Sequence, residues 1–179
     1  MNSINGPMFD EKFIKSVNII NEVKIFNELQ NYKKIIFFDF RNVADYNLNH
    51  LQHTIHLPFT EFEFDFFENL NEEKIKFIGN KLIQCDELKE MLKKYKRHYI
   101  VLILSEEKIK RKIIQSTCFE NFDPSDEKKS QITKCLMFYR ALRKNRVYEI
   151  GLYNLGFEKI IQHYDYLLVK ESRNNPLVK

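Results

Sequence analysis

One segment of the chain carries residue types that can attack an electrophile or bind an anion. It follows the apolar run Tyr99–Leu104 and reads Ser105, Glu106, Glu107, Lys108, Ile109, Lys110, Arg111. A guanidinium such as that of Arg111 can clamp an oxyanion through two parallel hydrogen bonds. Glu106 and Glu107 would repel such an anion, and no glycine lets this backbone turn its N–H groups inward. The pattern is more typical of a helix start, with Ser105 as the N-cap residue and acidic residues in the first turn.

The three cysteines are poor candidates for a nucleophile. Cys85 precedes two acidic residues, which disfavour the reactive thiolate. Cys118 follows a basic segment predicted to be helical rather than opening it, so no helix dipole activates it. Cys135 lies among apolar neighbours within a predicted helix, the usual position of a buried, inert thiol. No two of them form a C-x-x-C pair, so we expect neither a disulfide framework nor a zinc site, as in a reducing compartment.

Three histidines, His50, His53 and His56, are close enough in sequence to suggest a metal cluster. A metal site needs ligands that converge in space, however, and His56 lies on a predicted strand from which it cannot face both of the others. We therefore expect no metal ion and no cofactor.

The elements that must position these residues follow from apolar spacing. Two continuous apolar runs, Ile35–Phe38 and Tyr99–Leu104, are too short for helices and are typical of strands buried on both faces. Further strands are predicted at Val17–Ile20, Thr54–Leu57 and Val147–Leu152. Helices are predicted at Glu22–Gln30, Val43–Leu48, from Phe59 towards Tyr95, Lys108–Gln115, Ile132–Arg143 and Gly156–Tyr164, with an exposed loop at Asn121–Lys129.

Two of these helical predictions depend on particular side chains. Val23, Phe26 and Leu29 recur on one face of the first helix, and Ile75, Ile78 and Leu82 have helical spacing within the long central segment. Strands that alternate with helices imply parallel pairing through right-handed crossovers. The predicted fold is a three-layer α/β/α sandwich with a central, mainly parallel sheet.

Composition limits the classes of function. The chain has 179 residues, 44% hydrophobic and 30% charged, which suits one compact domain. A formal charge of +4, from 29 basic and 25 acidic residues, is too small to indicate nucleic-acid binding. No apolar run approaches the roughly 20 residues that span a bilayer, and the first residues lack a signal-peptide stretch. We expect a soluble, cytoplasmic protein without membrane insertion.

In an open parallel sheet, ligands bind beyond the carboxyl ends of the strands. The expected site therefore lies near three segments, Asp39–Arg41, Ser105–Arg111 and Leu152–Gly156.

Two of these segments belong to longer motifs. The spacing of Asp39, Arg41, Tyr46, His50, Ile55, Leu57 and Pro58 resembles the signature D-x-R-x(4)-Y-x(3)-H-x(4)-I-x-[IL]-P of rhodanese-like domains. The segment Val147–Phe157 resembles the final strand of that family and the Gly-Gly-aromatic turn that opens its last helix, with Leu155 in place of the first glycine. The resemblance covers about residues 17–168, which leaves residues 1–16 and 169–179 as expected tails.

The resemblance assigns structural roles to most of these residues. In the family the Asp and Arg tie loops together with the His, and the residues so implied here are Asp39, Arg41, Tyr46, His50, Pro58, Gly156 and Phe157. Active rhodaneses carry a catalytic Cys at the position of Ser105, and a hydroxyl cannot form the persulfide intermediate. The seven residues that end at Arg111 also resemble the C-x(5)-R phosphate loop of rhodanese-like cell-cycle phosphatases, again with Ser105 for the Cys.

The resemblance therefore implies a catalytically inactive rhodanese-like domain. We expect it to serve as a protein-binding or structural subunit of a larger assembly, such as a cytoskeletal or ciliary axoneme complex, whose other subunits hold the ends of the chain. Candidate contact residues are Lys108, Lys110, Arg111, Arg140 and Arg143, together with Phe64 and Phe67 of an acidic and aromatic stretch. The basic residues form a docking face only if they gather; otherwise they are solvated helix ends. The alternatives are an active sulfurtransferase or phosphatase, and a phosphopeptide reader that uses Arg111.

Overall fold

The computed structural model describes residues 9–30, 34–52, 54–57, 75–78, 81–84, 90, 93–94, 97–105, 109–110, 112, 114, 127–144 and 146–170. Its elements are α1 (Glu11–Ser16), β1 (Ile19–Ile20), α2 (Glu22–Gln30), β2 (Ile35–Asp39), α3 (Val43–Leu48), β3 (Asn49–Leu51), β4 (Thr54–His56), β5 (Ile75–Ile78), β6 (Lys81–Gln84), β7 (Tyr99–Ile103), α6 (Glu127–Lys144), β8 (Ile150–Tyr153), α7 (Phe157–His163), a 3-10 turn η2 (Asp165–Leu167) and β9 (Leu168–Lys170).

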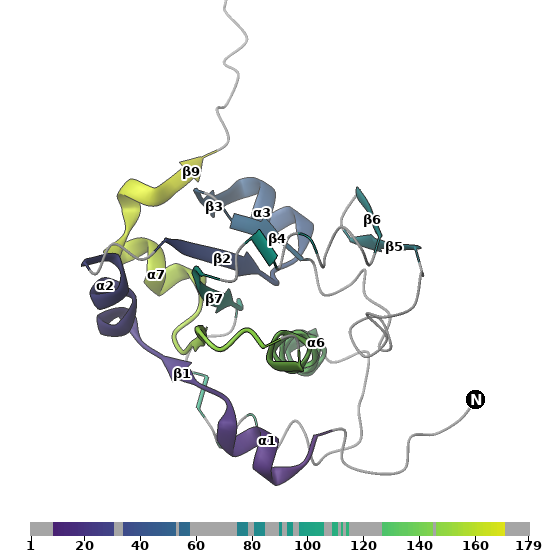
Figure 1. Cartoon of the computed structure of the whole chain (residues 1–179). Helices are drawn as coiled ribbons and strands as arrows, with labels where there is room; N and C mark the ends of the chain where they lie inside the picture. Colours follow the sequence, from purple (N-terminus) through teal and green to yellow (C-terminus); the bar gives the residue numbers. More distant parts are fainter. Residues whose placement is uncertain are drawn as a thin grey trace, which may run out of the picture.

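Five strands form the central sheet in the order β1-β8-β7-β2-β4. Every neighbouring pair is parallel, as in the β2–β7 pair, where Phe38 lies opposite Leu102. Figure 1 shows the helices on both sides of this sheet. The predicted class, a three-layer α/β/α sandwich around a parallel sheet, is confirmed.

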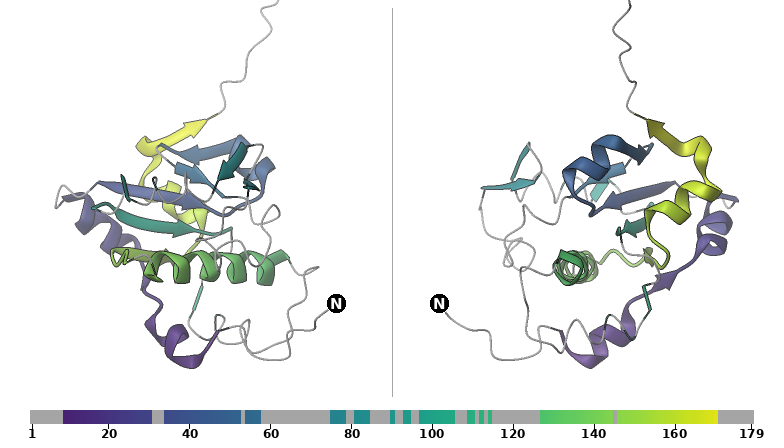
Figure 2. Two further views of the ribbon diagram at one scale, coloured as in Figure 1. Left: turned by 45° about the vertical axis from the view of Figure 1, so that its right-hand side comes forward. Right: turned by 180° about the vertical axis from the view of Figure 1, so that it is seen from behind.

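Adjacent side chains of the inner strands point to opposite faces of the sheet, so each inner strand contributes to a core on either side. On one side, Phe38 and Leu102 join a core that also contains residues of α1 and α6. On the other side, Phe37 and Val101 join a second core with residues of α2 and α7. Figure 2 shows α6 lying along one side of the sheet, with α1 beyond it.

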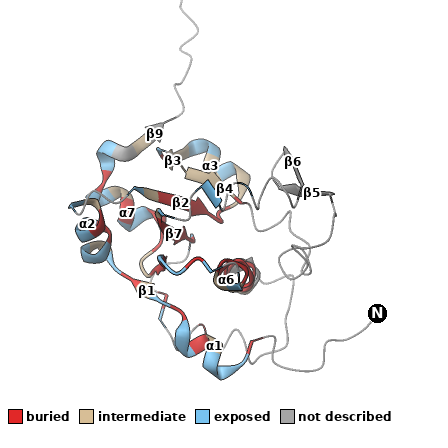
Figure 3. Ribbon diagram, viewed as in Figure 1, coloured by how far each residue is buried: buried red, intermediate tan, exposed pale blue. Residues whose placement is uncertain are grey.

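The helix α6 is buried over much of its length, as the red ribbon in Figure 3 shows. It begins at Glu127, so the end of the predicted loop Asn121–Lys129 is helical. Its outer side is covered by the segment that contains α1: the ring of Phe13 lies 6.1 Å from that of Tyr139, and the Tyr139 hydroxyl accepts a hydrogen bond from the Asn18 N–H at 3.1 Å.

Residues on both sides of the expected 17–168 unit also contact the rest of the fold. At its start, Phe9 and Ile14 are buried in the core, although they fall in the expected N-terminal tail. At its end, β9 pairs antiparallel with β3, so that Val169 lies opposite His50.

The helical prediction for Ile75, Ile78 and Leu82 is wrong. Ile75–Ile78 and Lys81–Gln84 are the antiparallel strands β5 and β6, which lie beside the central sheet in Figure 1. The sequence signal for this hairpin is the Gly-Asn dipeptide at 79–80 between two apolar runs, which favours a two-residue turn over a continuing helix.

The helix α2 has the predicted bounds, but the apolar face used to predict it is mostly not the buried one. Asn21 caps the helix, since its Oδ1 accepts a hydrogen bond from the Lys24 N–H at 3.1 Å. Ile25 is fully buried, whereas Val23 is 57% exposed and Phe26 is 52% exposed. Two large apolar side chains of α2 thus face outward.

Candidate functional site

The carboxyl ends of the central strands are joined by backbone hydrogen bonds. The Phe40 N–H donates to the Ile103 carbonyl at 3.0 Å, and the Phe157 N–H donates to the Leu104 carbonyl at 3.1 Å. The Ile109 N–H donates to the Asn154 carbonyl at 2.6 Å. The three segments predicted to border a site therefore do meet at one edge of the sheet.

A buried ion pair lies at the end of β2. Asp39 and Arg41 are 0% and 4% exposed, and Nη2 of Arg41 lies 2.8 Å from Oδ2 of Asp39. Nε of Arg41 donates to both carboxylate oxygens, at 3.1 and 3.0 Å, and the Arg41 backbone N–H donates to Oδ1 at 2.9 Å. The carboxylate of Asp39 is thus occupied by one arginine and has the geometry of a structural group.

Arg41 also reaches two other segments of the chain. Its Nη2 donates to the Asn49 carbonyl at 2.7 Å, at the start of β3. Its guanidinium carbon lies 3.4 Å from the centre of the Phe157 ring, in the first turn of α7. This arrangement ties the end of β2 to both elements, and stacking on an aromatic face is favourable for a guanidinium.

Gly156 lies at the start of α7 in a backbone conformation that favours glycine. Its φ of 74° and ψ of 175° are values that side-chain-bearing residues rarely adopt. It occupies the N-cap position of α7 without a side-chain hydrogen bond, directly before Phe157.

Tyr46 lies between two histidines. Its ring centre is 4.2 Å from that of His50 and 4.0 Å from that of His56, with interplanar angles of 12° and 3°. Two imidazoles at these distances cannot share one face of the ring, so they flank it. His50 Nδ1 donates to the Tyr46 carbonyl at 3.0 Å, and His56 Nε2 donates to the Arg41 carbonyl at 2.9 Å. Burial raises the pKa of the Tyr46 hydroxyl, and the nearby Asp39 carboxylate acts in the same direction.

This stack separates the two histidines that sequence proximity brought together as metal ligands. His53 lies outside the described residues. Within the described part of the chain, no group of three His, Cys, Asp or Glu side chains is placed to hold a metal ion.

Ser105 is bound by a residue that sequence reasoning missed. Its backbone N–H and its hydroxyl both donate to Oε1 of Gln131 in α6, at 2.8 and 2.9 Å. Gln131 is buried, whereas Ser105 itself is exposed. An N-capping Ser105 would accept hydrogen bonds from the N–H groups of Glu107 or Lys108, which lie outside the described residues, so the capping prediction stays a prediction. No local pattern signals Gln131, which is 26 residues away along the chain.

The remainder of the Ser105 segment is only partly described. Ile109 is buried and Lys110 is exposed, and neither belongs to a regular element. Lys112 and Ile114 are helical, and the Ile114 N–H donates to the Lys110 carbonyl at 3.2 Å. Glu106, Glu107, Lys108 and Arg111 of this segment lie outside the described part of the chain, as does Pro58 of the Asp39–Pro58 signature.

Of the candidate partner-binding residues, the described part of the chain contains Lys110, Arg140 and Arg143, so the gathered basic surface stays a prediction. The Arg140 guanidinium lies 4.8 Å from the Phe9 ring centre, and that of Arg143 lies 4.7 Å from the ring centre of Tyr148. Arg140 thus helps to hold the segment before α1. Phe64 and Phe67 lie outside the described residues.

The chain has also been compared with known proteins. No protein-family model matches it, and no curated protein matches it. Among solved structures, it is similar to Ygr203w from Saccharomyces cerevisiae, described as a homolog of single-domain rhodanese and of the Cdc25 phosphatase catalytic domain. The identity is 12%, the TM-score is 0.47, and the match covers 90% of this chain and 92% of that chain.

A second similar structure is the BH2092 protein from Bacillus halodurans. Its identity is 11% and its TM-score 0.37, with 83% of this chain and 74% of that chain covered. Neither similarity is informative about activity, ligands or partners. No helix among the described residues is long and apolar enough to cross a membrane.

Proposed function

We propose that this protein is a catalytically inactive rhodanese-like domain that acts by binding other proteins, as a docking or structural subunit of an assembly. The observation that carries this proposal is the double hydrogen bond from Ser105 to Gln131, at the position where the resemblance to rhodanese-like domains implies the catalytic Cys.

Two chemical requirements of a sulfurtransferase or phosphatase are unfavourable at this position. A covalent intermediate in these enzymes needs a thiolate, and Ser105 offers a hydroxyl. An anion-binding loop also needs free N–H donors aimed at the developing charge. The Ser105 N–H already donates to the Gln131 amide oxygen, an acceptor that an incoming anion would have to displace.

The cysteines support the same proposal as far as they are described. Cys135 is fully buried, and burial raises the pKa of its thiol, so the nucleophilic thiolate is disfavoured. Cys85 and Cys118 lie outside the described residues.

The proposal is tested by activity and binding measured on the same purified protein. We expect no thiosulfate:cyanide sulfurtransfer and no hydrolysis of p-nitrophenyl phosphate above the buffer rate, for the wild type and for Ser105→Ala alike. We also expect a tagged copy of the protein, expressed at its native level, to co-purify with a fixed set of protein subunits. Turnover lost in Ser105→Ala or Cys118→Ser would overturn the proposal, as would a chain that purifies without partners.

The kind of assembly is part of the proposal and is identified by the same experiment. A cytoskeletal or ciliary complex predicts that the co-purifying subunits are axonemal or filament proteins. The expectation that neighbouring subunits hold the chain ends depends on residues 1–8 and 171–179. These residues lie outside the described part of the chain.

A further inference from the structure

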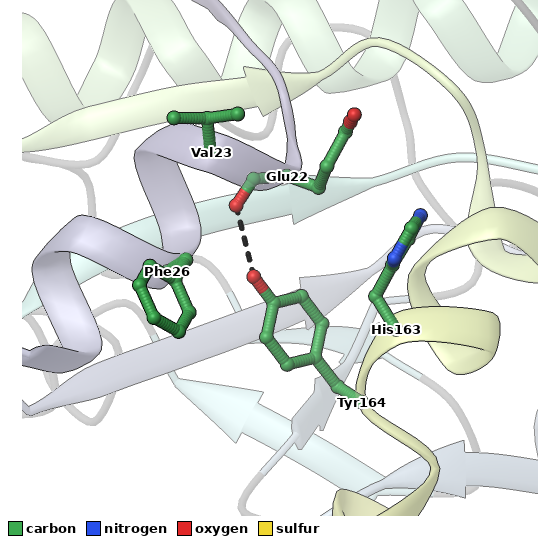
Figure 4. Close-up of a pocket in the computed structure, with 5 residues that line it drawn as sticks. All are labelled: Glu22, Val23, Phe26, His163 and Tyr164. Carbon is green, nitrogen blue, oxygen red and sulfur yellow. Dashed lines mark hydrogen bonds between the residues drawn. The ribbon is translucent and has the colours of Figure 1, made fainter.

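A pocket lies between α2 and α7, and none of the residues described above at the strand ends lines it. Its volume is about 280 Å³, and it is lined by Glu22, Val23, Phe26, His163 and Tyr164. In Figure 4 the rings of Phe26 and Tyr164 lie next to each other, and the side chain of His163 extends beside Tyr164 toward the side of the Glu22 carboxylate. Ligand pockets for small molecules are usually about 300–1,000 Å³, so this volume suits one or two inserted side chains better than a metabolite.

The apolar part of the pocket is exposed although its residue types favour burial. Val23 and Phe26 are among the large apolar side chains that the described residues leave exposed, and Tyr166 is another. Tyr166 packs edge-on against Tyr164, with ring centres 6.3 Å apart. Apolar side chains therefore continue from the pocket onto the surface beside it, as is common at sites that bind another protein.

The polar part of the pocket contains a carboxylate, that of Glu22, with one oxygen left unpaired by the described part of the chain. Oε2 of Glu22 is buried and has no hydrogen-bond partner among the described residues. The nearest lysine in sequence, Lys24, is engaged by Glu28 at 2.6 Å. The Tyr164 hydroxyl donates to the Glu22 carbonyl at 2.9 Å rather than to the carboxylate, as the dashed line in Figure 4 marks.

An unpaired buried carboxylate oxygen is unfavourable, and a cationic partner relieves that penalty. A ligand that covers the pocket would therefore bind better with a basic group placed at Glu22 and an apolar group placed against the neighbouring rings. The Tyr153 hydroxyl, a second buried group without a described hydrogen-bond partner, lies close enough to Glu22 for its pKa to be raised, mainly by burial and also by that carboxylate.

We propose that the α2–α7 pocket is the docking site for a segment of a partner protein that inserts an apolar side chain against Phe26 and Tyr164 and places a Lys or Arg at Glu22. This inference rests on the proposed function, because it names the surface and the chemistry by which the domain binds its partner.

The test selects random 12-residue peptides, displayed on phage, against the full-length protein and measures the affinity of the enriched synthetic peptides by fluorescence anisotropy. We expect enrichment of an apolar residue beside a Lys or Arg. Glu22→Gln should weaken binding roughly tenfold, since it removes one charge-assisted hydrogen bond, and Phe26→Ala should weaken it at least as much. Replacing the basic residue of the peptide by norleucine should weaken binding to the wild type but not to Glu22→Gln.

Two matched variants control for general effects. Glu158→Gln removes an exposed acidic residue from the first turn of α7, and Leu48→Ala removes an exposed apolar side chain from α3. Both should leave the affinity within twofold of the wild type. Equal affinities for wild type, Glu22→Gln and Phe26→Ala, or an acidic consensus among the peptides, would overturn the pocket proposal. Partners that still co-purify with Phe26→Ala would leave the proposed function in place and assign docking to another surface.

Discussion

The buried pair formed by Asp39 and Arg41 makes the sharpest prediction about stability. Asp39→Leu removes a fully buried carboxylate that accepts three hydrogen bonds from the Arg41 guanidinium. The hydrogen bond from Nη2 of Arg41 to the Asn49 carbonyl remains. The substitution leaves a guanidinium that is 4% exposed without a counter-charge. Breaking such a pair from one side costs about 3–5 kcal/mol. This is a large part of the roughly 5–15 kcal/mol by which a domain is stable in total. At about 2–4 °C per kcal/mol for a domain of this size, the change should lower the midpoint of thermal unfolding by roughly 6–20 °C.

A double-mutant cycle separates the pair from the volume it fills. Arg41→Met should be destabilising for the converse reason, since it strands the Asp39 carboxylate in the core. The double variant Asp39→Leu/Arg41→Met should be less destabilised than the sum of the single variants, by about 2–3 kcal/mol, because it removes both charges together.

Urea unfolding followed by circular dichroism measures the cycle, and an exposed pair serves as the control. Glu11 and Lys15 of α1 lie 2.7 Å apart with side chains more than half exposed, so Glu11→Ala should change the unfolding free energy by no more than about 0.5 kcal/mol. A cost below about 1 kcal/mol for Asp39→Leu, or single costs that add within about 0.5 kcal/mol, would refute the assigned role of this pair.

Four further predictions concern single residues. Gly156→Ala should lower the free energy of unfolding in urea by about 1–3 kcal/mol, because the positive φ of Gly156 is unfavourable for alanine. Gly151→Ala should lower it by a similar amount, because the added Cβ would lie 2.6 Å from the Ile20 side chain. Unchanged unfolding midpoints would contradict both predictions. Burial, with a contribution from Glu28, raises the pKa of the Tyr99 hydroxyl to about 12. The neutral hydroxyl therefore stabilises the fold below pH 10, and this stabilisation is lost as the pH rises from 10 to about 12. Urea unfolding across that pH range should show a smaller loss of stability in Tyr99→Phe than in the wild type. In a Cys85→Ser/Cys118→Ser variant, the buried Cys135 should react with a disulfide reagent only after unfolding in guanidinium, and rapid labelling of the native protein would show that the thiol is accessible.

The sequence predicts the sheet well because burial on both faces leaves a local trace. Ile35–Phe38 and Tyr99–Leu104 are continuous apolar runs, and these two segments became the β2–β7 pair at the centre of the sheet. Asp39, Arg41 and Gly156 were also identifiable, since their types and spacing match a signature whose purpose is structural. The Arg41 guanidinium stacks on Phe157, which is more than a hundred residues away along the chain, and only the fold brings these two side chains together.

Other features leave no such trace. The α2 periodicity marks Val23 and Phe26 as members of an apolar face, but periodicity does not say whether another element covers that face. Helical spacing of three apolar residues predicts a helix where the structure has the β5–β6 hairpin, although the Gly-Asn dipeptide at 79–80 favours a turn. Gln131 meets Ser105 only through the packing of α6 against the end of β7, which no pattern within either segment encodes.

The two regions considered for function differ in whether their polar groups are already used. At the strand ends, the Arg41 guanidinium, the Ser105 N–H and hydroxyl, and the ring N–H groups of His50 and His56 each donate to an acceptor within the chain. A substrate that bound there would have to displace these contacts and would gain little net free energy. In the α2–α7 pocket, one oxygen of the Glu22 carboxylate is unpaired among the described residues and the Phe26 ring is exposed. A partner that covers them gains free energy from a new hydrogen bond and from the burial of apolar surface. Among the described groups, those of the α2–α7 pocket thus have more interactions left to offer a partner than those at the strand ends, which supports the proposed docking site.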